Sequence, residues 1–142
     1  ITIMKKLLLL LLTITYFSLS SFAQQEWTKI YNESDVMVEM ATIECNPTDR
    51  MVPYSYVILK YTNKTNQIID FNFEIFKWYN GVLQIENATD AGDFSIQKGI
   101  KLQPNSSQEG NCDSDLDYLR VFGNNNNPKM PSELTRIEIK AI

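Results

Sequence analysis

Residues 67–79 read Gln67-Ile68-Ile69-Asp70-Phe71-Asn72-Phe73-Glu74-Ile75-Phe76-Lys77-Trp78-Tyr79. From Ile69 to Ile75 the odd-numbered positions are all apolar, whereas the even-numbered positions are polar or charged. Because side chains alternate between the two faces of a strand, this pattern predicts a strand with one face in the core and the other in solvent. Phe76 and Trp78 then place apolar residues in the opposite phase. Either a β-bulge near 75–76 keeps them on the core face, or the strand crosses between two sheets.

Two turns flank this strand. Asn80-Gly81 predicts a tight type I′ hairpin, because both central residues of that turn need positive φ. In that register Tyr79 pairs with Val82, Trp78 with Leu83 and Phe76 with Ile85. On the other side, Asn63-Lys64-Thr65-Asn66 separates the alternating runs 54–62 and 67–79, and we expect these two runs to form an antiparallel hairpin.

The remainder of the chain after residue 23 has further short alternating runs and no sustained helical periodicity. The run 36–45 alternates, and 54–62 is largely apolar on both faces, which favours a central strand. Shorter strands are predicted at 94–96 and 100–102 about a turn at Lys98-Gly99, at 119–122 and at 134–141. Residues 103–110 and 123–128 indicate loops, being rich in Asn, Ser, Pro and Gly. Seven to nine short antiparallel strands predict an all-β sandwich or barrel.

The N-terminal residues have the parts of a cleavable secretory signal. Met4-Lys5-Lys6 precedes an apolar run, and the small residues Ser21 and Ala23 lie three and one positions before the expected cleavage. The apolar run is shorter than the roughly 20 residues that span a bilayer. We therefore expect residues 1–3 to lie upstream of the start Met4, 1–23 to be a signal peptide, and 24–142 to form one secreted or periplasmic domain without a transmembrane segment.

The composition argues against several classes of function. The 142 residues include 13 Lys+Arg, 17 Asp+Glu and no histidine. Without Lys5 and Lys6, 11 basic residues face 17 acidic ones and the net charge is −6, so no basic patch for nucleic acid is expected. The lack of histidine removes His-activated nucleophiles and His metal sites. Ser106 and Ser107 have no G-x-S-x-G setting, so we expect a non-enzyme with no catalytic residues and no cofactor.

Two groups of residues are candidates for other chemistry. Cys45 and Cys112 are the two cysteines of the chain, and outside the cytosol they predict one disulfide, with two separate buried thiols as the alternative. Asp113, Asp115 and Asp117 alternate as hard oxygen ligands for Ca²⁺ would, but the spacing does not fit an EF-hand. We therefore expect no metal there, and a solvated acidic turn is the favoured interpretation.

Aromatic residues supply the candidates for binding. Two alternating faces cannot both be core, so some of these rings are expected on an exposed sheet face, where a protein or a glycan could contact them. The alternative is that they pack between the sheets or under loops. The candidates are Tyr54, Tyr56, Trp78 and Tyr79, and Tyr61 belongs to the same group of rings.

Several of these segments together resemble a group of small secreted immunoglobulin-like β-sandwich proteins of Gram-negative bacteria that have no assigned function. The resemblance rests on residues 56–66, 73–81, 100–107, 110–112 and 119–122, which include Tyr61-Thr62-Asn63, Trp78-Tyr79-Asn80-Gly81 and Leu119-Arg120-Val121-Phe122. It implies an immunoglobulin-like β-sandwich. Antibody features are not implied, because Trp78 lies 33 residues after Cys45 rather than roughly a dozen.

These observations predict a secreted or periplasmic, non-enzymatic binding module. A purely structural envelope protein is the first alternative. A small hydrolase is the second, with a carboxylate pair drawn from Asp70, Glu74, Asp90 and Asp93. The ligand and the oligomeric state are not predicted.

Overall fold

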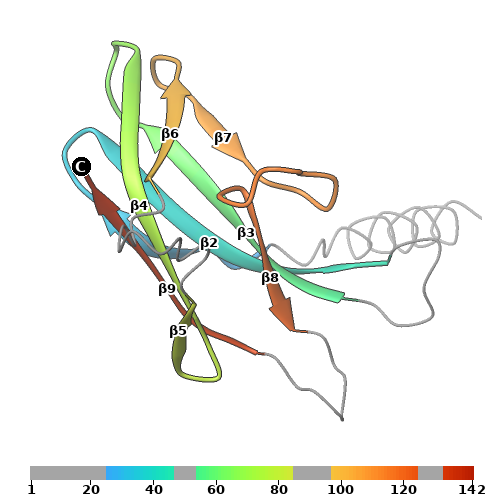
Figure 1. Cartoon of the computed structure of the whole chain (residues 1–142). Coiled ribbons are helices and arrows are strands. Elements are labelled where there is room, and N and C mark those ends of the chain that lie inside the picture. The colour runs from blue at the N-terminus through green and yellow to red at the C-terminus, as the bar shows by residue number, and fades with distance from the viewer. Residues whose placement is uncertain (1–24, 47–53, 85–96, 125–132) are drawn as a thin grey trace, which may run out of the picture.

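The alternating segments lie in two antiparallel sheets that pack face to face (Figure 1). The computed structural model describes residues 25–46, 54–84, 97–124 and 133–142, and its nine strands confirm the all-β sandwich of seven to nine strands. Sheet A contains β1 (Thr28–Asn32), β2 (Val36–Cys45), β3 (Tyr54–Asn63), β7 (Ser107–Glu109) and β8 (Arg120–Asn124). Sheet B contains β4 (Ile69–Tyr79), β5 (Val82–Gln84), β6 (Gln97–Leu102) and β9 (Leu134–Ala141).

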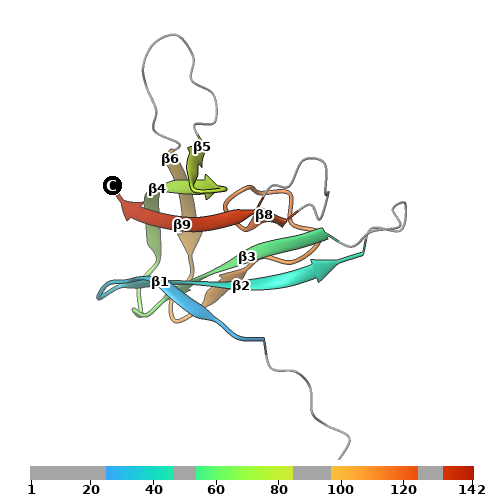
Figure 2. The ribbon, with the colours of Figure 1, turned by 90° about the horizontal axis from the view of Figure 1, so that it is seen from below.

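Each sheet is organised around one central strand. In sheet A, β2 pairs with all ten residues of β3, and β7 and β8 also pair with β3. In sheet B, β4 pairs with β5, β6 and β9. The chain therefore crosses from one sheet to the other after β3, after β6 and after β8 (Figure 2). The two-sided apolar run that predicted a central strand is β3.

The core lies between the inner faces of the two sheets. Phe71 and Phe73 stack with ring centroids 5.1 Å apart, and Tyr61 lies 5.3 Å from Phe73. Tyr61 is fully buried, and its hydroxyl donates a hydrogen bond of 2.8 Å to the carbonyl oxygen of Tyr118. Tyr61 is therefore a core residue and not a binding residue. Burial raises its pKa above the ordinary value of 10, because the tyrosinate anion would lose its hydration there.

The predicted hairpin between 54–62 and 67–79 is wrong, because β3 and β4 belong to different sheets. The reason is Asn63, which is 1% exposed. Its Nδ2 donates to the carbonyl oxygens of Gln67 at 2.7 Å and Gln103 at 3.0 Å, while its Oδ1 accepts from the Thr65 amide at 2.8 Å. These bonds hold residues 63–67 against Gln103, which follows β6. We call residues 63–67, which connect β3 in sheet A to β4 in sheet B, the arch.

The predicted interruption of β4 near 75–76 is also wrong. The register between β4 and β9 runs without a shift from Phe73 to Trp78 and changes only between Trp78 and Tyr79. Simple alternation therefore places Phe76 and Trp78 on the outer face of sheet B, opposite in direction to Ile75. There the guanidinium carbon of Arg136 lies 4.5 Å from the ring centroid of Trp78.

The Asn80-Gly81 hairpin is confirmed. The two residues have φ of 50° and 79°, and Tyr79 pairs with Val82 and Trp78 with Leu83. Ile85, the expected partner of Phe76, lies outside the described residues, as does the strand predicted at 94–96.

The predicted turn at Lys98-Gly99 is wrong, because β6 continues through both residues. Gly99 pairs with Asn72, and a Cβ at Gly99 would lie 2.9 Å from the Asn72 side-chain oxygen. The glycine therefore makes room for a cross-strand side chain and does not turn the chain. The alternation did not predict β1 or β7. Among the described residues, no helix is long and apolar enough to cross a membrane.

Candidate binding surface

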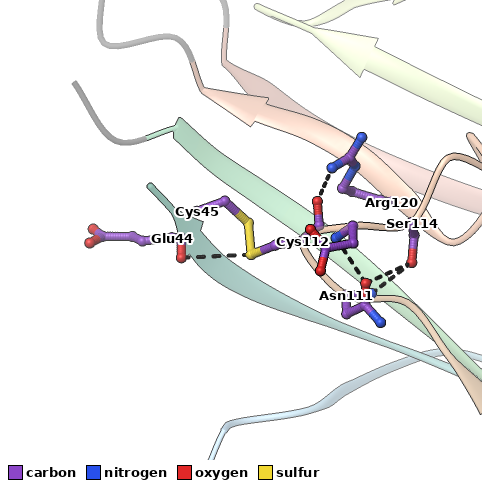
Figure 3. Close-up of a disulfide and its surroundings, with 7 residues drawn as sticks. Glu44, Cys45, Asn111, Cys112, Ser114 and Arg120 are labelled. Carbon is purple, nitrogen blue, oxygen red and sulfur yellow. Dashed lines mark hydrogen bonds between the residues drawn. A yellow bond between two sulfur atoms is a disulfide. The ribbon is translucent and has the colours of Figure 1, made fainter. Parts of the chain in front are cut away.

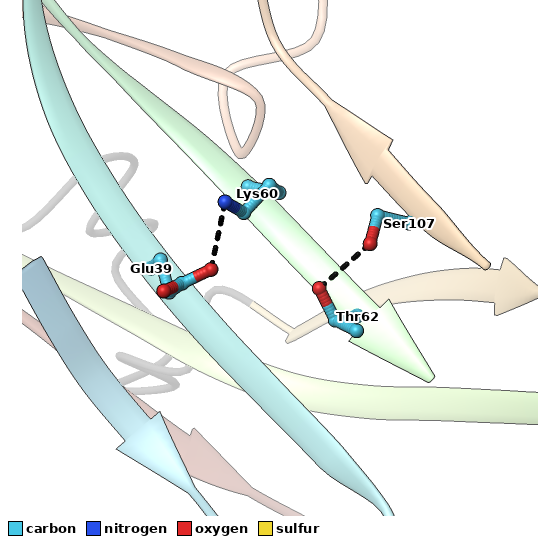
Figure 4. A network of polar contacts seen from close by, with 4 residues as sticks. All are labelled: Glu39, Lys60, Thr62 and Ser107. Atoms are coloured by element: carbon cyan, nitrogen blue, oxygen red, sulfur yellow. Dashed lines mark hydrogen bonds and ion pairs between the residues drawn. The ribbon is translucent and has the colours of Figure 1, made fainter. Parts of the chain in front are cut away.

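The outer face of sheet A carries mainly charged and hydroxyl side chains along the half that contains β1 and β7. The register places Lys29, Glu39, Lys60 and Glu109 in one row across four strands, so that the charges alternate in sign. Lys60 Nζ lies 2.8 Å from Glu39 Oε2, and the hydroxyls of Thr62 and Ser107 are 2.8 Å apart (Figure 4). The Lys60 and Glu39 side chains are only 19% and 12% exposed, and the ring centroid of Trp27 lies 4.0 Å from Lys60 Nζ.

The same face is aromatic along its other half. Tyr54 and Tyr56 in β3 point to this face, and the register places Phe122 of β8 opposite Tyr56. The centroid of Phe122 lies 5.8 Å from that of Tyr54 and 5.7 Å from that of Tyr56, and all three rings meet edge to face. The Arg120 guanidinium carbon lies 4.8 Å from the centroid of Tyr56. We call Tyr54, Tyr56, Phe122 and Arg120 the aromatic cluster.

The predicted disulfide is present, and Figure 3 shows it near Arg120 of the aromatic cluster. Cys45 is the last residue of β2, whereas Cys112 lies in the connection between β7 and β8. Arg120 Nη1 donates a hydrogen bond to the carbonyl oxygen of Cys112. Because Cys45 and Arg120 point to the outer face by register, these two links hold residue 112 on that face.

The connection that carries Cys112 is a large loop inserted into one edge of sheet A. The Gly110 amide donates to the carbonyl oxygen of Leu59 at 3.0 Å, and the Leu59 amide donates to the carbonyl oxygen of Leu119 at 2.9 Å. The chain therefore leaves β3 and returns to it at the same residue. Within the loop, the Asn111 side-chain oxygen accepts from the amide of Asp113 at 2.8 Å, which makes a local turn.

A small pocket of about 170 Å³ lies where the loop meets the aromatic cluster. This volume is below the roughly 300 Å³ at which pockets for drug-sized ligands begin. It can take one side chain rather than a whole ligand. Its lining residues are Cys45, Asn46, Tyr56, Cys112, Asp113 and Arg120.

The other two predicted aromatic candidates lie elsewhere. Trp78 is on the outer face of sheet B, with the ring of Phe76 at 6.3 Å and Leu83 as its cross-strand partner. Tyr79 points inward, and its hydroxyl donates to the carbonyl oxygen of Phe122 at 2.7 Å. The structure therefore brings Tyr54 and Tyr56 together and separates them from Trp78 and Tyr79. Phe122 was missed, because only the pairing of β8 with β3 places it in the aromatic cluster.

The acidic candidates are separated or paired with lysines. Asp117 forms an ion pair with Lys98 at 2.7 Å, which ties the loop to sheet B. Within the described residues, no three carboxylate or cysteine side chains are grouped as a metal ion would require, so Asp113, Asp115 and Asp117 do not converge.

Two of the four carboxylates of the hydrolase hypothesis lie beside lysines. Asp70 lies 3.5 Å from Lys101 and Glu74 lies 3.5 Å from Lys140. Asp90 and Asp93 lie outside the described residues.

No model of a known protein family, no curated protein and no solved structure matches this chain.

Proposed function

We propose that the protein is a secreted or periplasmic, non-enzymatic binding module that contacts a protein partner through the aromatic cluster. The observation that carries this proposal is the change of character along one sheet face. The half of the face at β1 and β7 carries the Glu39–Lys60 ion pair beside the single ring of Trp27, whereas the half at β8 presents the cluster of Tyr54, Tyr56, Phe122 and Arg120. Tyrosine, phenylalanine and arginine are enriched in protein–protein interfaces, where tyrosine and arginine often dominate the binding energy.

The geometry of the rings favours a protein over a glycan. Sugar rings stack on an open aromatic face, but in the aromatic cluster each ring meets another edge to face. One face of Tyr56 is also covered by Arg120. What the cluster offers is an uneven, half-buried apolar surface beside a pocket for a single side chain, which suits a polypeptide surface.

The crossings between the sheets support an immunoglobulin-like module. In that fold, consecutive strands B and C lie in opposite sheets, strand E returns to the sheet of B, and strand F returns to that of C. The order of β3, β4, β8 and β9 follows the same alternation. The disulfide supports an oxidising compartment, since such bonds are rare in the cytosol.

Site-specific photo-crosslinking in the producing cell tests this proposal. A photoreactive phenylalanine analogue replaces Tyr54 in one variant and Thr62, on the polar half of the same face, in the control. We expect a discrete crosslinked protein from position 54 and none from position 62. The proposal fails if neither position gives a product or both give the same one. The structural alternative, an envelope protein without a specific partner, predicts one of these two failures.

A further inference from the structure

The hydrogen bonds of Leu59 in β3 show toward which neighbouring strand each amide and carbonyl group of β2 points. The amide and carbonyl of Leu59 both bond to the β7–β8 side, so they point away from β2. Met40 is the register partner of Leu59, and in an antiparallel ladder its backbone groups must then point away from β3. The directions alternate along a strand. Thr42 and Glu44 therefore also direct their amide and carbonyl groups toward the outer edge of β2. The Glu44 carbonyl oxygen lies 4.0 Å from Cys112 Sγ, which has no hydrogen to donate because it is in the disulfide.

That edge is open over the second half of β2. β1 pairs with β2 only from Met37 to Met40, and within the described residues no strand pairs with the outer edge from Ala41 to Cys45. The two views agree that β2 and β3 run on past sheet B at this end (Figures 1 and 2). Thr42 and Glu44 are accordingly exposed. An edge of this kind is a template for another strand.

A second observation lies where β1 begins. A pocket of about 320 Å³ occupies the notch between residues 25–28 and β2, lined by Gln25, Glu26, Thr28, Met40, Ala41 and Thr42. The pocket leaves room beside Thr42 for the backbone of an added chain.

We propose that the edge Ala41–Cys45 binds an extended segment of a partner protein by strand addition. The segment pairs with the backbone groups of Thr42 and Glu44 and carries basic side chains toward Glu26 and Glu44. This inference rests on the proposed function and specifies the partner of the same surface. Ile43 pairs with Tyr56, so a strand added beside β2 extends the sheet face that carries the aromatic cluster. Backbone pairing supplies affinity and the alternate side chains supply specificity.

Charge favours such a segment over a second copy of this chain. Glu26 and Glu44 are both exposed at this short edge. Two copies of β2 paired about a two-fold axis would bring four carboxylates together, and like charges on adjacent strands destabilise their pairing. A partner segment with lysine or arginine at these positions has no such cost.

Hydrogen exchange of the free protein tests the edge. We expect the amides of Thr42 and Glu44 to exchange rapidly, while the amide of Ile43, which points toward β3, is protected. Slow exchange at Thr42 in dilute protein would show that the edge is already closed and would overturn the proposal. Protection that appears only with rising protein concentration would identify a second copy as the occupant and would equally overturn it.

A synthetic peptide in which valine alternates with lysine serves as the probe of binding. We expect it to protect the amides of Thr42 and Glu44, and we expect the same peptide with alternate backbone nitrogens methylated to protect neither. Thr42→Pro removes the amide that faces the edge and leaves the β2–β3 ladder intact, so it should weaken binding about tenfold. Thr42→Ala keeps the amide and should bind as the wild type does.

Equal binding of the peptide to wild type and to Thr42→Pro, or equal binding of its methylated form, would place the peptide elsewhere and refute strand addition. That result would leave the proposed function standing if crosslinking from position 54 persists. If crosslinking from position 54 fails while the peptide protects Thr42, binding of a partner at the aromatic cluster is refuted, and strand addition at the edge of β2 is not. Should Thr42→Pro not fold, the methylated peptide and the exchange rates decide the question with the wild-type protein.

Discussion

Replacing Asn63 should destabilise the sandwich more than any other single polar substitution in the arch between β3 and β4. The side chain is 1% exposed and holds one end of the arch to the segment after β6. In Asn63→Ala the carbonyl oxygens of Gln67 and Gln103 lose their donor, and the Thr65 amide loses its acceptor. The Thr65 hydroxyl, which donates to Asn63 Oδ1 at 2.9 Å, is also released.

The magnitude follows from counting these bonds. Four hydrogen bonds of 2.7 to 3.0 Å are lost, each contributing about 1 kcal/mol net to stability. The arch is partly exposed and water can replace some of them, so we expect a loss of about 3 kcal/mol in the free energy of unfolding. That is a large share of the roughly 5–15 kcal/mol available to a domain. The corresponding fall in Tm is about 10 °C.

Denaturant unfolding followed by circular dichroism measures the loss, and two further variants separate its causes. Asn63→Asp keeps the volume but places a carboxylate against two carbonyl oxygens, so it should cost at least as much as alanine. Asn66→Ala, in the same arch and exposed, should change stability by less than about 0.5 kcal/mol. A wild-type midpoint for Asn63→Asp would refute the argument, because the amide hydrogens would then contribute nothing.

Three other perturbations test separate parts of the structure by the same measurement. Replacing both Cys45 and Cys112 with serine should lower stability by up to about 4 kcal/mol, since their bond closes a loop of 67 residues; a variant as stable as the wild type would contradict this. The raised pKa of Tyr61 means that its stabilising effect is complete below pH 10 and is lost as the pH rises above 10, where the unfolded chain ionises first. Tyr61→Phe should therefore lose about 1 kcal/mol at pH 7 and show a shallower decline between pH 10 and 11, and parallel curves would refute the assignment. Gly110→Ala should cost about 3 kcal/mol because its Cβ would overlap the backbone oxygen of Leu119, whereas Gly99→Ala meets only a side chain that can move and should cost less.

The sequence predicted those features that depend on local pattern. The alternating runs gave the bounds of β2 and β9, and β4 differs from its prediction only at its start. The hairpin at Asn80-Gly81 was predictable because its turn type depends on two adjacent residues whose backbones tolerate positive φ. The disulfide was predictable from the number of cysteines and the expected compartment.

Pairings between distant segments could not be predicted in this way. Alternation tells which side chains share a face, but not which strand lies next to them. The hairpin expected at 63–66 failed because the bonds of Asn63 to Gln103 decide the path of the chain, and these residues are far apart in sequence. The bulge or crossing expected near 75–76 also failed, because the register with β9 continues to Trp78 and places this half-buried ring on the outer face of sheet B.

The candidate surface was predictable only in part for the same reason. Tyr54 and Tyr56 share a face by simple alternation, which the sequence indicates. Phe122 and Arg120 join them through the pairing of β8 with β3, and the open edge of β2 depends on where β1 begins. Neither relation leaves a signal in the local sequence. A site that lies between strands is therefore found only once their order is known.

The position of the disulfide connects stability with the proposed binding surface. Both of its cysteines belong to sheet A, one in β2 and one in the loop between β7 and β8, so it does not join the two layers of the core. It borders the pocket beside Tyr56 and lies next to the edge that ends at Cys45. A domain of this size buries enough surface to fold without a crosslink. The bond is therefore best understood as fixing the loop and the end of β2, the two elements that frame the aromatic cluster, so that the surface is preformed and less conformational entropy is lost when a partner binds.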